Sequence, residues 1–389
     1  MIEFGISVYP EQEDINETLA YIRMAGKYGC TRLFTSMFSI DDIEAVKNKF
    51  SLLTKTAHEC GITVTTDANP KLFERLGTSE KDLSPIKELG IDVLRMDVPF
   101  FGEKDITLVN NDQGIIIEFN AMLPQFVDAI YAKAEHKENI RICYNFYPER
   151  YTGVDYKPYV NLNEHYKKMN LPLGMFISSQ EKNTHGPWPI TNGLCTLEEQ
   201  RTMDVDLAIR EVLAIGGISA IMIGNAYASE EEFKKLNSIK NFLEEKEEAQ
   251  SFNTGTESHT IPVDLTRKKV LLNIELAEDI TDIEKEILIN FKNHSDAGDG
   301  TAYMLRSRFP RMAYGRSAIP PRPYKPSHFT KGDVVIVNDT LSRYKAEVQI
   351  VLKDMENDGQ RNFLGRIPEE EIHILDYLKP RDIFRFKEK

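Results

Sequence analysis

Three carboxylates stand at the ends of short apolar stretches that have the character of buried strands. The segment GIIIEFNAM over 114–122 places Glu118 directly after three isoleucines, and Asp67 and Asp97 close the earlier stretches ITVTTD and DVLRMD. Apolar, β-branched runs are typical of strands buried on both faces, where an unpaired charge is costly. The pattern therefore predicts a chemical role for these carboxylates, at one shared edge where the strands end.

Carboxylates and amides gathered at one edge have the equipment to hydrolyse a glycosidic bond. One carboxyl group protonates the leaving oxygen, and a second stabilises or attacks the oxocarbenium-like centre. We predict that Glu118 is the acid, because its longer side chain reaches a leaving oxygen above the floor of the site. Asp97 is its predicted partner and Asp67 a supporting group. Asn120 and Asn145 follow their strands at the matching level and would orient the sugar.

Two other kinds of protein are compatible with the same residues. Asp67, Asp97, Glu118 and His185 could bind a divalent ion in a metal-dependent phosphosugar isomerase or lyase, although no two histidines have metal-ligand spacing. Loss of activity on chelation, reversed by metal, would favour that enzyme. The third alternative is a non-enzymatic carbohydrate-binding or scaffold protein, which leaves the strand-end carboxylates unexplained.

Loop residues supply candidate contacts to a sugar. Tyr147 lies in NFYPERY after the sixth predicted strand, and His185 lies in HGPW with the only tryptophan of the chain. Aromatic rings pack against sugar faces, and their polar ends hydrogen-bond hydroxyl groups. The alternative for the segment around Tyr147 is a packed loop that covers the site.

Two other places supply candidate contacts to an anion. Gly224 and Asn225 precede a predicted helix, where backbone N–H groups bind phosphate. Arg306 and Arg308 belong to an arginine-rich stretch that could deliver cations to an anionic ligand at the edge where the strands end, the mouth of the predicted barrel. A plain strand–helix turn and a solvated face are the respective alternatives. Because the formal net charge is −13, an anionic ligand would need such a local cationic pocket.

The elements that must position these residues follow a repeating pattern over 1–248. Strand-sized apolar stretches recur roughly every thirty residues, and Gly29, Gly61 and Gly90 end the helices between them. This rhythm predicts an α/β fold, a (β/α)₈ TIM barrel whose active site is formed by the C-terminal ends of its strands. An open doubly wound sheet is the competitor, but it would more often carry G-x-G-x-x-G after its first strand.

The remaining residues, 249–389, predict a second and smaller domain. A polar linker at 250–259 is followed by short apolar runs that turn residues separate. We expect a mostly antiparallel β domain with one helix near 282–293.

Composition limits the partners and the location of the protein. The acidic balance argues against general binding to nucleic acid or to an anionic membrane. The longest apolar stretches are strand-sized, and no basic, apolar leader follows Met1, so we expect neither a membrane span nor a signal peptide. Four widely spaced cysteines are typical of reduced thiols in a cytoplasmic protein. A homodimer is a candidate assembly.

Several motifs along the chain point together to one family. They are FGISVYP, FTSMFS, LRMD, IEFNA, NFYPERYTG and HGPWPITNGLCTLEEQR in the first part, with LRSR, KGDVVIVND and YKAEVQI in the second. Taken together they resemble the bacterial 6-phospho-N-acetylmuramidases over nearly the whole chain. The resemblance implies a TIM barrel followed by a cyclophilin-like domain, with neither a metal nor an organic cofactor. It also implies a phosphorylated disaccharide substrate, whose β-1,4 bond between N-acetylmuramic acid 6-phosphate and N-acetylglucosamine is cleaved in cytoplasmic cell-wall recycling.

Overall fold

The computed structural model describes residues 2–36, 43–188, 192–245, 250–253, 258–261, 267–298 and 300–389. The chain divides into two compact units, unit 1 with Met1–Ile209 and Gly217–Glu244, and unit 2 with Arg210–Gly216 and Glu245–Lys389. The predicted domain boundary between residues 248 and 249 lies outside the described residues. Within the described ranges, no helix is both long and apolar enough to cross a membrane.

Unit 1 contains a closed barrel of eight strands, which confirms the predicted TIM barrel. The strands are β1 (Glu3–Ser7), β2 (Arg32–Thr35), β3 (Thr63–Ala68), β4 (Val93–Met96), β5 (Ile116–Asn120), β6 (Ile140–Cys143), β7 (Leu173–Ile177) and β8 (Ala220–Ile223). Each strand pairs in parallel with the next one along the chain, and β8 closes the barrel by pairing in parallel with β1.

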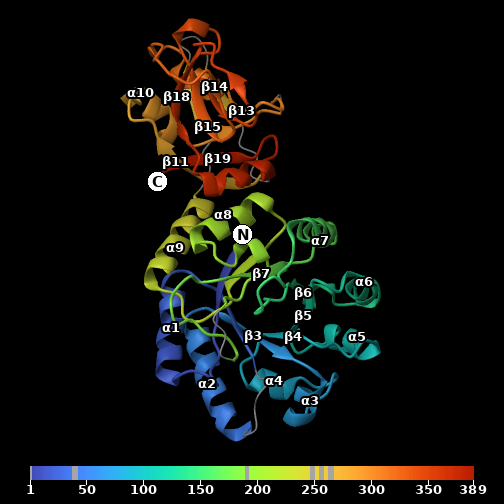
Figure 1. Cartoon of the computed structure of the whole chain (residues 1–389). Coiled ribbons are helices and arrows are strands. Elements are labelled where there is room, and N and C mark those ends of the chain that lie inside the picture. The colour runs from blue at the N-terminus through green and yellow to red at the C-terminus, as the bar shows by residue number, and fades with distance from the viewer. Residues whose placement is uncertain are drawn as a thin grey trace. The chain divides into compact units, whose positions relative to one another are not determined.

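Helices surround these strands on the outside (Figure 1). They are α1 (Ile15–Lys27), α2 (Ile43–Glu59), α3 (Pro70–Leu76), α4 (Ser84–Glu88), α5 (Glu103–Val109), α6 (Pro124–Lys133), α7 (Tyr156–Lys168), α8 (Val205–Ile215) and α9 (Glu230–Glu244). Local signals set their ends, as in α1, where the Asp14 carboxylate accepts bonds from the first-turn N–H groups and Gly29 adopts a left-handed φ of 85° just beyond the last turn.

The register of the barrel aligns four charged residues across neighbouring strands. Asp67 on β3 is paired with Arg95 on β4, Arg95 with Glu118 on β5, and Glu118 with Arg141 on β6. Register partners in a sheet point to the same face, so acidic and basic side chains alternate along one ring. The barrel can bury these charges because each acidic side chain has a basic neighbour at the same level.

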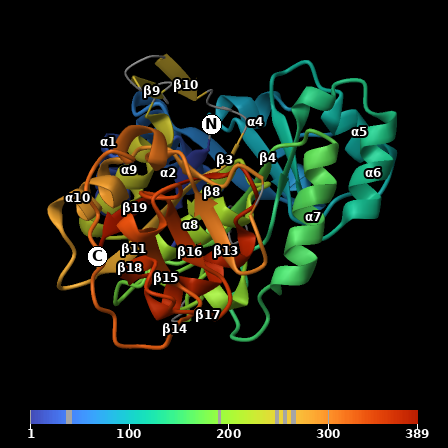
Figure 2. The ribbon, with the colours of Figure 1, turned by 90° about the horizontal axis from the view of Figure 1, so that it is seen from above.

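Unit 2 contains a seven-stranded sheet with the order β12-β19-β11-β18-β15-β16-β13. Its strands are β11 (Lys269–Leu276), β12 (His294–Ser295), β13 (Met304–Ser307), β15 (Asp333–Val337), β16 (Val348–Val351), β18 (Arg361–Arg366) and β19 (Ile383–Glu388). β11 and β19 are parallel, and the other pairs are antiparallel, which confirms the predicted mostly antiparallel domain. Figure 2 shows β11, β15, β16, β18 and β19 side by side in this sheet.

Smaller elements complete unit 2. Two two-stranded sheets pair β9 (Gln250–Asn253) with β10 (Ser258–Ile261), and β14 (His328–Phe329) with β17 (Met355–Glu356). The predicted helix near 282–293 is present as α10 (Asp282–Lys285), continued by a π-helical turn. A short helix that we did not predict, α11 (Pro310–Tyr314), follows β13, and its five residues are too few for a helical periodicity to be visible.

Candidate active site

Arg95 joins the carboxylates and the amide that the sequence places at the strand ends. Its Nη1 lies 2.6 Å from Asp67 Oδ1 and 3.5 Å from Asp97 Oδ1. Its Nη2 donates a hydrogen bond to Asn145 Oδ1, and its Nε lies 3.8 Å from Glu118 Oε1. The predicted residues of β3, β4, β5 and β6 are therefore brought together, and the group between them is a guanidinium.

This arrangement affects the metal-dependent alternative. The guanidinium of Arg95 forms ion pairs with Asp67 and Asp97, the two aspartates that a divalent ion would need as ligands, and it neutralises part of their negative charge. Across the ranges that the structure describes, no group of three or more His, Cys, Asp or Glu side chains is arranged to hold a metal ion. Asp67 and Asp97 are thus bridged by the side chain of Arg95.

Glu118 lies deeper than the sequence suggested. Its side chain is 0% exposed and its Oε2 accepts a hydrogen bond from Arg32 Nη2 at 2.7 Å, with Arg95 on its other oxygen. A carboxylate enclosed by two buried arginines is held in place by them and does not open toward solvent. This burial does not favour the acid role that we predicted for Glu118, and it favours a positioning role.

Asp67 and Asp97 differ in their surroundings although they contact the same nitrogen. The Asp67 side chain is 8% exposed, whereas that of Asp97 is 35% exposed. Burial raises the pKa of Asp67 to about 7, aided by the charges of Asp97 and Glu118, and the opposing effect of Arg95 does not cancel the rise. Asp67 is therefore a carboxyl group that holds a proton near neutral pH, which a general acid requires.

A second polar cluster forms around Glu13, whose side chain is 1% exposed. Its Oε1 accepts from Tyr9 N at 2.7 Å and lies 2.9 Å from His185 Nε2. Its Oε2 accepts from Thr18 Oγ1 at 2.7 Å and from Tyr227 Oη at 3.0 Å. Glu13 thus fixes the ring of His185 through Nε2.

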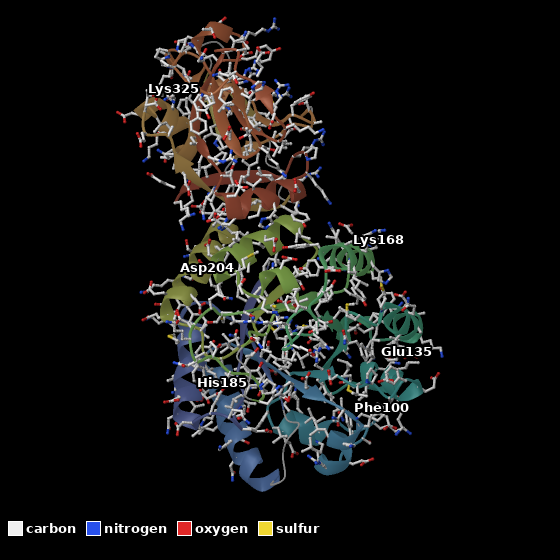
Figure 3. All side chains as sticks on the ribbon, in the orientation of Figure 1. Phe100, Glu135, Lys168, His185, Asp204 and Lys325 are labelled. Atoms are coloured by element: carbon white, nitrogen blue, oxygen red, sulfur yellow. The ribbon has the colours of Figure 1, made fainter. Side chains whose placement is uncertain are left out.

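Tyr9 connects the two clusters. The rings of Tyr9 and His185 pack edge to face, with their centroids 6.3 Å apart. Burial raises the pKa of the Tyr9 hydroxyl, and the charge of Asp67 adds to the rise. Figure 3 shows His185 among the loops beside the barrel strands, whereas Glu135 and Lys168 lie in the surrounding helical layer. His185, predicted as a substrate contact, is therefore placed at the same end of the barrel as the carboxylates.

The residues after β8 form hydrogen bonds with neighbouring loops of the protein. Gly224 N donates to Ile177 O at 2.8 Å, and the Asn225 amide makes two bonds with the backbone of Ser179. A Cβ on Gly224 would lie 2.1 Å from Leu194 O, so close packing requires glycine here. These contacts engage the Gly224 N–H and the Asn225 side chain, and the predicted phosphate role of the two residues stays a prediction.

The remaining predicted substrate contacts are on β5, on the loop after β6 and in unit 2. Asn120 ends β5, and its Oδ1 accepts from Met122 N at 2.9 Å. Tyr147 is half-buried, and burial raises the pKa of its hydroxyl while the charge of Arg95 opposes the rise. Arg306 and Arg308 belong to unit 2, so their predicted role at the barrel stays a prediction.

Arg95 and Glu13 are functional candidates that the sequence analysis missed. Arg95 lies inside the apolar stretch DVLRMD, and a charge within a buried strand requires a partner just as Glu118 does. Applying that rule to both signs of charge would have found Arg95. Glu13 carries no such signal, because it precedes a helix in a polar segment and its partner His185 is 172 residues away.

Comparisons with known proteins agree with this fold and identify a family. The family model of the 6-phospho-N-acetylmuramidase N-terminal domain matches residues 4–238, and the family model of the C-terminal domain matches residues 270–387. The crystal structure of an uncharacterized B. cereus protein is 32% identical over 100% of both chains, with a TM-score of 0.84. A conserved protein from a locus in Enterococcus faecalis, of unknown function, is 24% identical over 100% of this chain and 96% of its own, with a TM-score of 0.66, and supports the fold alone.

A search of curated proteins gave no match. The two family models together cover both units, and the barrel model alone spans more than half of the 389 residues. This chain therefore belongs to the 6-phospho-N-acetylmuramidase family, a family of glycosidases.

Proposed function

We propose that the protein hydrolyses the β-1,4 bond between N-acetylmuramic acid 6-phosphate and N-acetylglucosamine, in the cytoplasm and as a step of cell-wall recycling. Family membership supports the glycosidase class and a phosphorylated sugar as substrate. The observation that carries the proposal is the pair Asp67 and Asp97 on one nitrogen of Arg95. Two neighbouring carboxyl groups in unlike surroundings are the apparatus of a glycosidase.

Asp67 is the general acid in this proposal. Its pKa of about 7 leaves much of the group protonated at neutral pH, so it can deliver a proton to the leaving oxygen. The carboxylate that remains after the transfer lies 2.6 Å from Arg95 Nη1, where the guanidinium stabilises its charge. The group recovers a proton more readily because its surroundings are nearly dry.

Asp97 is the second carboxylate of the mechanism. It is the more exposed of the two and therefore the one that a sugar in the site can contact directly. We assign it to the positive charge that develops at the anomeric carbon, or to the acetamido group if that group attacks the carbon. Arg95 keeps Asp97 and Asp67 at a fixed spacing, which lets both act on one bond.

The sugar is oriented by the polar groups around this pair. Asn145 accepts from Arg95 through Oδ1, so its Nδ2 hydrogens can bond to a sugar hydroxyl. His185, held by Glu13 through Nε2, contributes its imidazole, and the half-buried Tyr147 supplies an aromatic face. Asn120 is the remaining amide at this end of the barrel, with its Oδ1 already bonded to Met122 N.

The direct test is incubation of the purified protein with the phosphorylated and unphosphorylated disaccharides, with products identified by mass. Hydrolysis adds one water and yields two monosaccharides from the phosphorylated substrate, at a rate roughly a hundredfold above the unphosphorylated one, since charge-assisted contacts to a phosphate contribute several kcal/mol. Asp97→Asn should abolish most of this activity, and Asp128→Asn on α6 is the matched control. A product of unchanged mass would instead identify an isomerase and contradict the proposal.

A further inference from the structure

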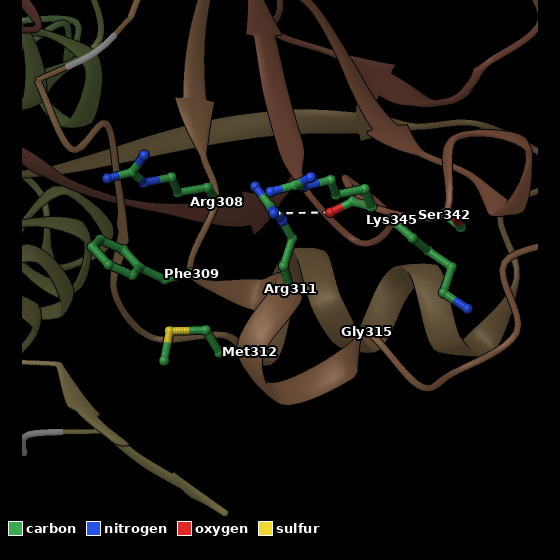
Figure 4. Close-up of a pocket in the computed structure, with 8 residues that line it drawn as sticks. Arg308, Phe309, Arg311, Met312, Gly315, Ser342 and Lys345 are labelled. Carbon is green, nitrogen blue, oxygen red and sulfur yellow. Dashed lines mark hydrogen bonds between the residues drawn. The ribbon is translucent and has the colours of Figure 1, made fainter. Parts of the chain in front are cut away.

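Unit 2 contains a cationic pocket that the barrel chemistry does not use. It has a volume of about 550 Å³, which is within the range of small-molecule sites. Four of its lining side chains are cationic and two are apolar, namely Arg308, Arg311, Arg343 and Lys345, with Phe309 and Met312. Figure 4 shows Phe309 and Met312 on one side of the pocket and Lys345 on the other, with Arg311 between them.

The position of Arg311 is fixed by its contacts. Nη1 lies 3.3 Å from Glu347 Oε2, Nη2 donates to the backbone oxygen of Arg343 at 2.8 Å, and the guanidinium lies 4.9 Å from the centre of the Tyr344 ring. Glu347 itself is 0% exposed and also holds Arg306 through two hydrogen bonds. Because of these contacts, Arg311 is ordered before any ligand arrives, which lowers the entropy cost of binding.

Carboxylates offset only part of the positive charge of this region. One carboxylate, Glu347, is shared between Arg306 and Arg311, and Asp339 Oδ1 lies 3.1 Å from Lys345 Nζ. Arg343 adds a further cation, with an exposed side chain. In a chain of net charge −13, cations concentrated around one concave surface create a local positive potential that attracts anions. Arginines are suited to bidentate contacts with phosphate oxygens.

We propose that this pocket binds the phosphate monoester of a small sugar. The phosphate would lie among Arg311, Arg343 and Lys345, and the organic part would contact Phe309 and Met312. The pocket is an open concavity whose volume of about 550 Å³ accommodates a ligand of one sugar ring, whereas a nucleic acid would require an extended cationic surface. Arg308 also lines the pocket, and the site belongs to unit 2 whichever bond the barrel cleaves.

The test is titration calorimetry on the full chain with glucose 6-phosphate, inorganic phosphate and glucose as probes. We expect glucose 6-phosphate to bind more tightly than inorganic phosphate, and glucose to show no binding. Arg343→Ala should weaken sugar phosphate binding by about tenfold, because it removes one charge-assisted contact. This variant keeps the backbone oxygen that Arg311 bonds, so the pocket retains its shape. Lys345→Ala should weaken binding to a similar degree.

Lys325→Ala is the matched control, because it removes an exposed cation of unit 2 that does not line the pocket. It should leave the affinity unchanged. Absence of binding at millimolar concentrations, or equal weakening by Lys325→Ala, would overturn the proposal. Equal affinity for glucose 6-phosphate and inorganic phosphate would overturn the assignment to a monoester.

Discussion

Arg95 Nη1 contacts Asp67 Oδ1 at 2.6 Å, so a cation from β4 is bonded directly to the carboxyl group that β3 presents. Arg95 lowers the pKa of Asp67, but burial raises it by more, and the result is a value of about 7. The same guanidinium also contacts Asp97, Asn145 and the Oε1 atom of Glu118. Arg95 is therefore the positioning residue around which the proposed site is built.

The first prediction concerns Glu118. Glu118→Gln removes the charge that pairs with Arg32 at 2.7 Å, and the Arg32 side chain is only 2% exposed. Leaving that guanidinium without its main partner should lower the free energy of unfolding by about 3–5 kcal/mol. Chemical denaturation monitored by circular dichroism measures the change. Glu103→Gln, which breaks an exposed pair with Lys133, is the control and should leave the unfolding midpoint unchanged.

Kinetics distinguish this positioning role from the acid role that the sequence suggested. If Glu118 were the acid, Glu118→Gln would keep full stability and recover its rate on a substrate with an activated leaving group, which needs no proton. We expect neither result, because the variant disturbs the position of Arg95 and not the supply of the proton.

The second prediction separates Arg306 from Arg308. Arg306 makes two hydrogen bonds with the buried Glu347, so Arg306→Ala should destabilise unit 2 by roughly 2–3 kcal/mol, a loss limited by the remaining contact from Arg311. Arg308 lines the proposed phosphate pocket, so Arg308→Ala should weaken the binding of glucose 6-phosphate. Urea unfolding of Arg306→Ala and calorimetry on Arg308→Ala test the two roles, and an Arg306→Ala variant of full stability or an Arg308→Ala variant of full affinity would refute them.

The third prediction concerns pH and the stability of unit 2. His294 is fully buried, with Nδ1 2.9 Å from Ser307 Oγ and Nε2 3.1 Å from Leu288 O, and burial lowers its pKa to about 4. The unfolded chain, with an ordinary histidine pKa near 6.5, therefore binds the proton first as pH falls. Stability is complete above about pH 6.5 and should fall by about 2 kcal/mol by pH 5.

Hydrogen exchange of the β19 amides, measured between pH 7 and pH 5 and corrected for intrinsic exchange, reports this loss. His294→Gln should remove the slope even if it lowers stability overall, and His328→Gln, an exposed site in the same unit, is the matched control. An unchanged slope in His294→Gln would assign the pH dependence to other groups.

The barrel was predictable because its signals are local. The isoleucines before Glu118, the strand-sized apolar stretches and the glycines with left-handed φ at 29, 61 and 90 lie within a few residues of the elements that they define. The second unit was predictable for a similar reason, since β11 alternates between buried and partly exposed side chains along KVLLNIEL.

The pairing of side chains was not predictable in the same way. Whether Asp67 faces Arg95 depends on the register between β3 and β4, and one sequence does not carry that register. The depth of Glu118 depends on Arg32, which lies 86 residues earlier in the chain. The sequence identified Asp67, Asp97 and Glu118 as one group, but their different burial, on which the proposed roles depend, arises only in the folded barrel.

The central claim is that Asp67 delivers the proton to the leaving group. Its test is the pH dependence of kcat/KM for wild type and Asp67→Asn, on the disaccharide and on a substrate with an activated leaving group. Because the protonated form is required, wild-type kcat/KM should fall as pH rises above about 7. Asp67→Asn should be slower by about 10²–10⁴ on the disaccharide, lack this decline, and regain most of its rate on the activated substrate. Asp97→Asn should stay slow on both substrates, and an Asp67→Asn enzyme that keeps the decline or gains nothing from the activated substrate would contradict the account.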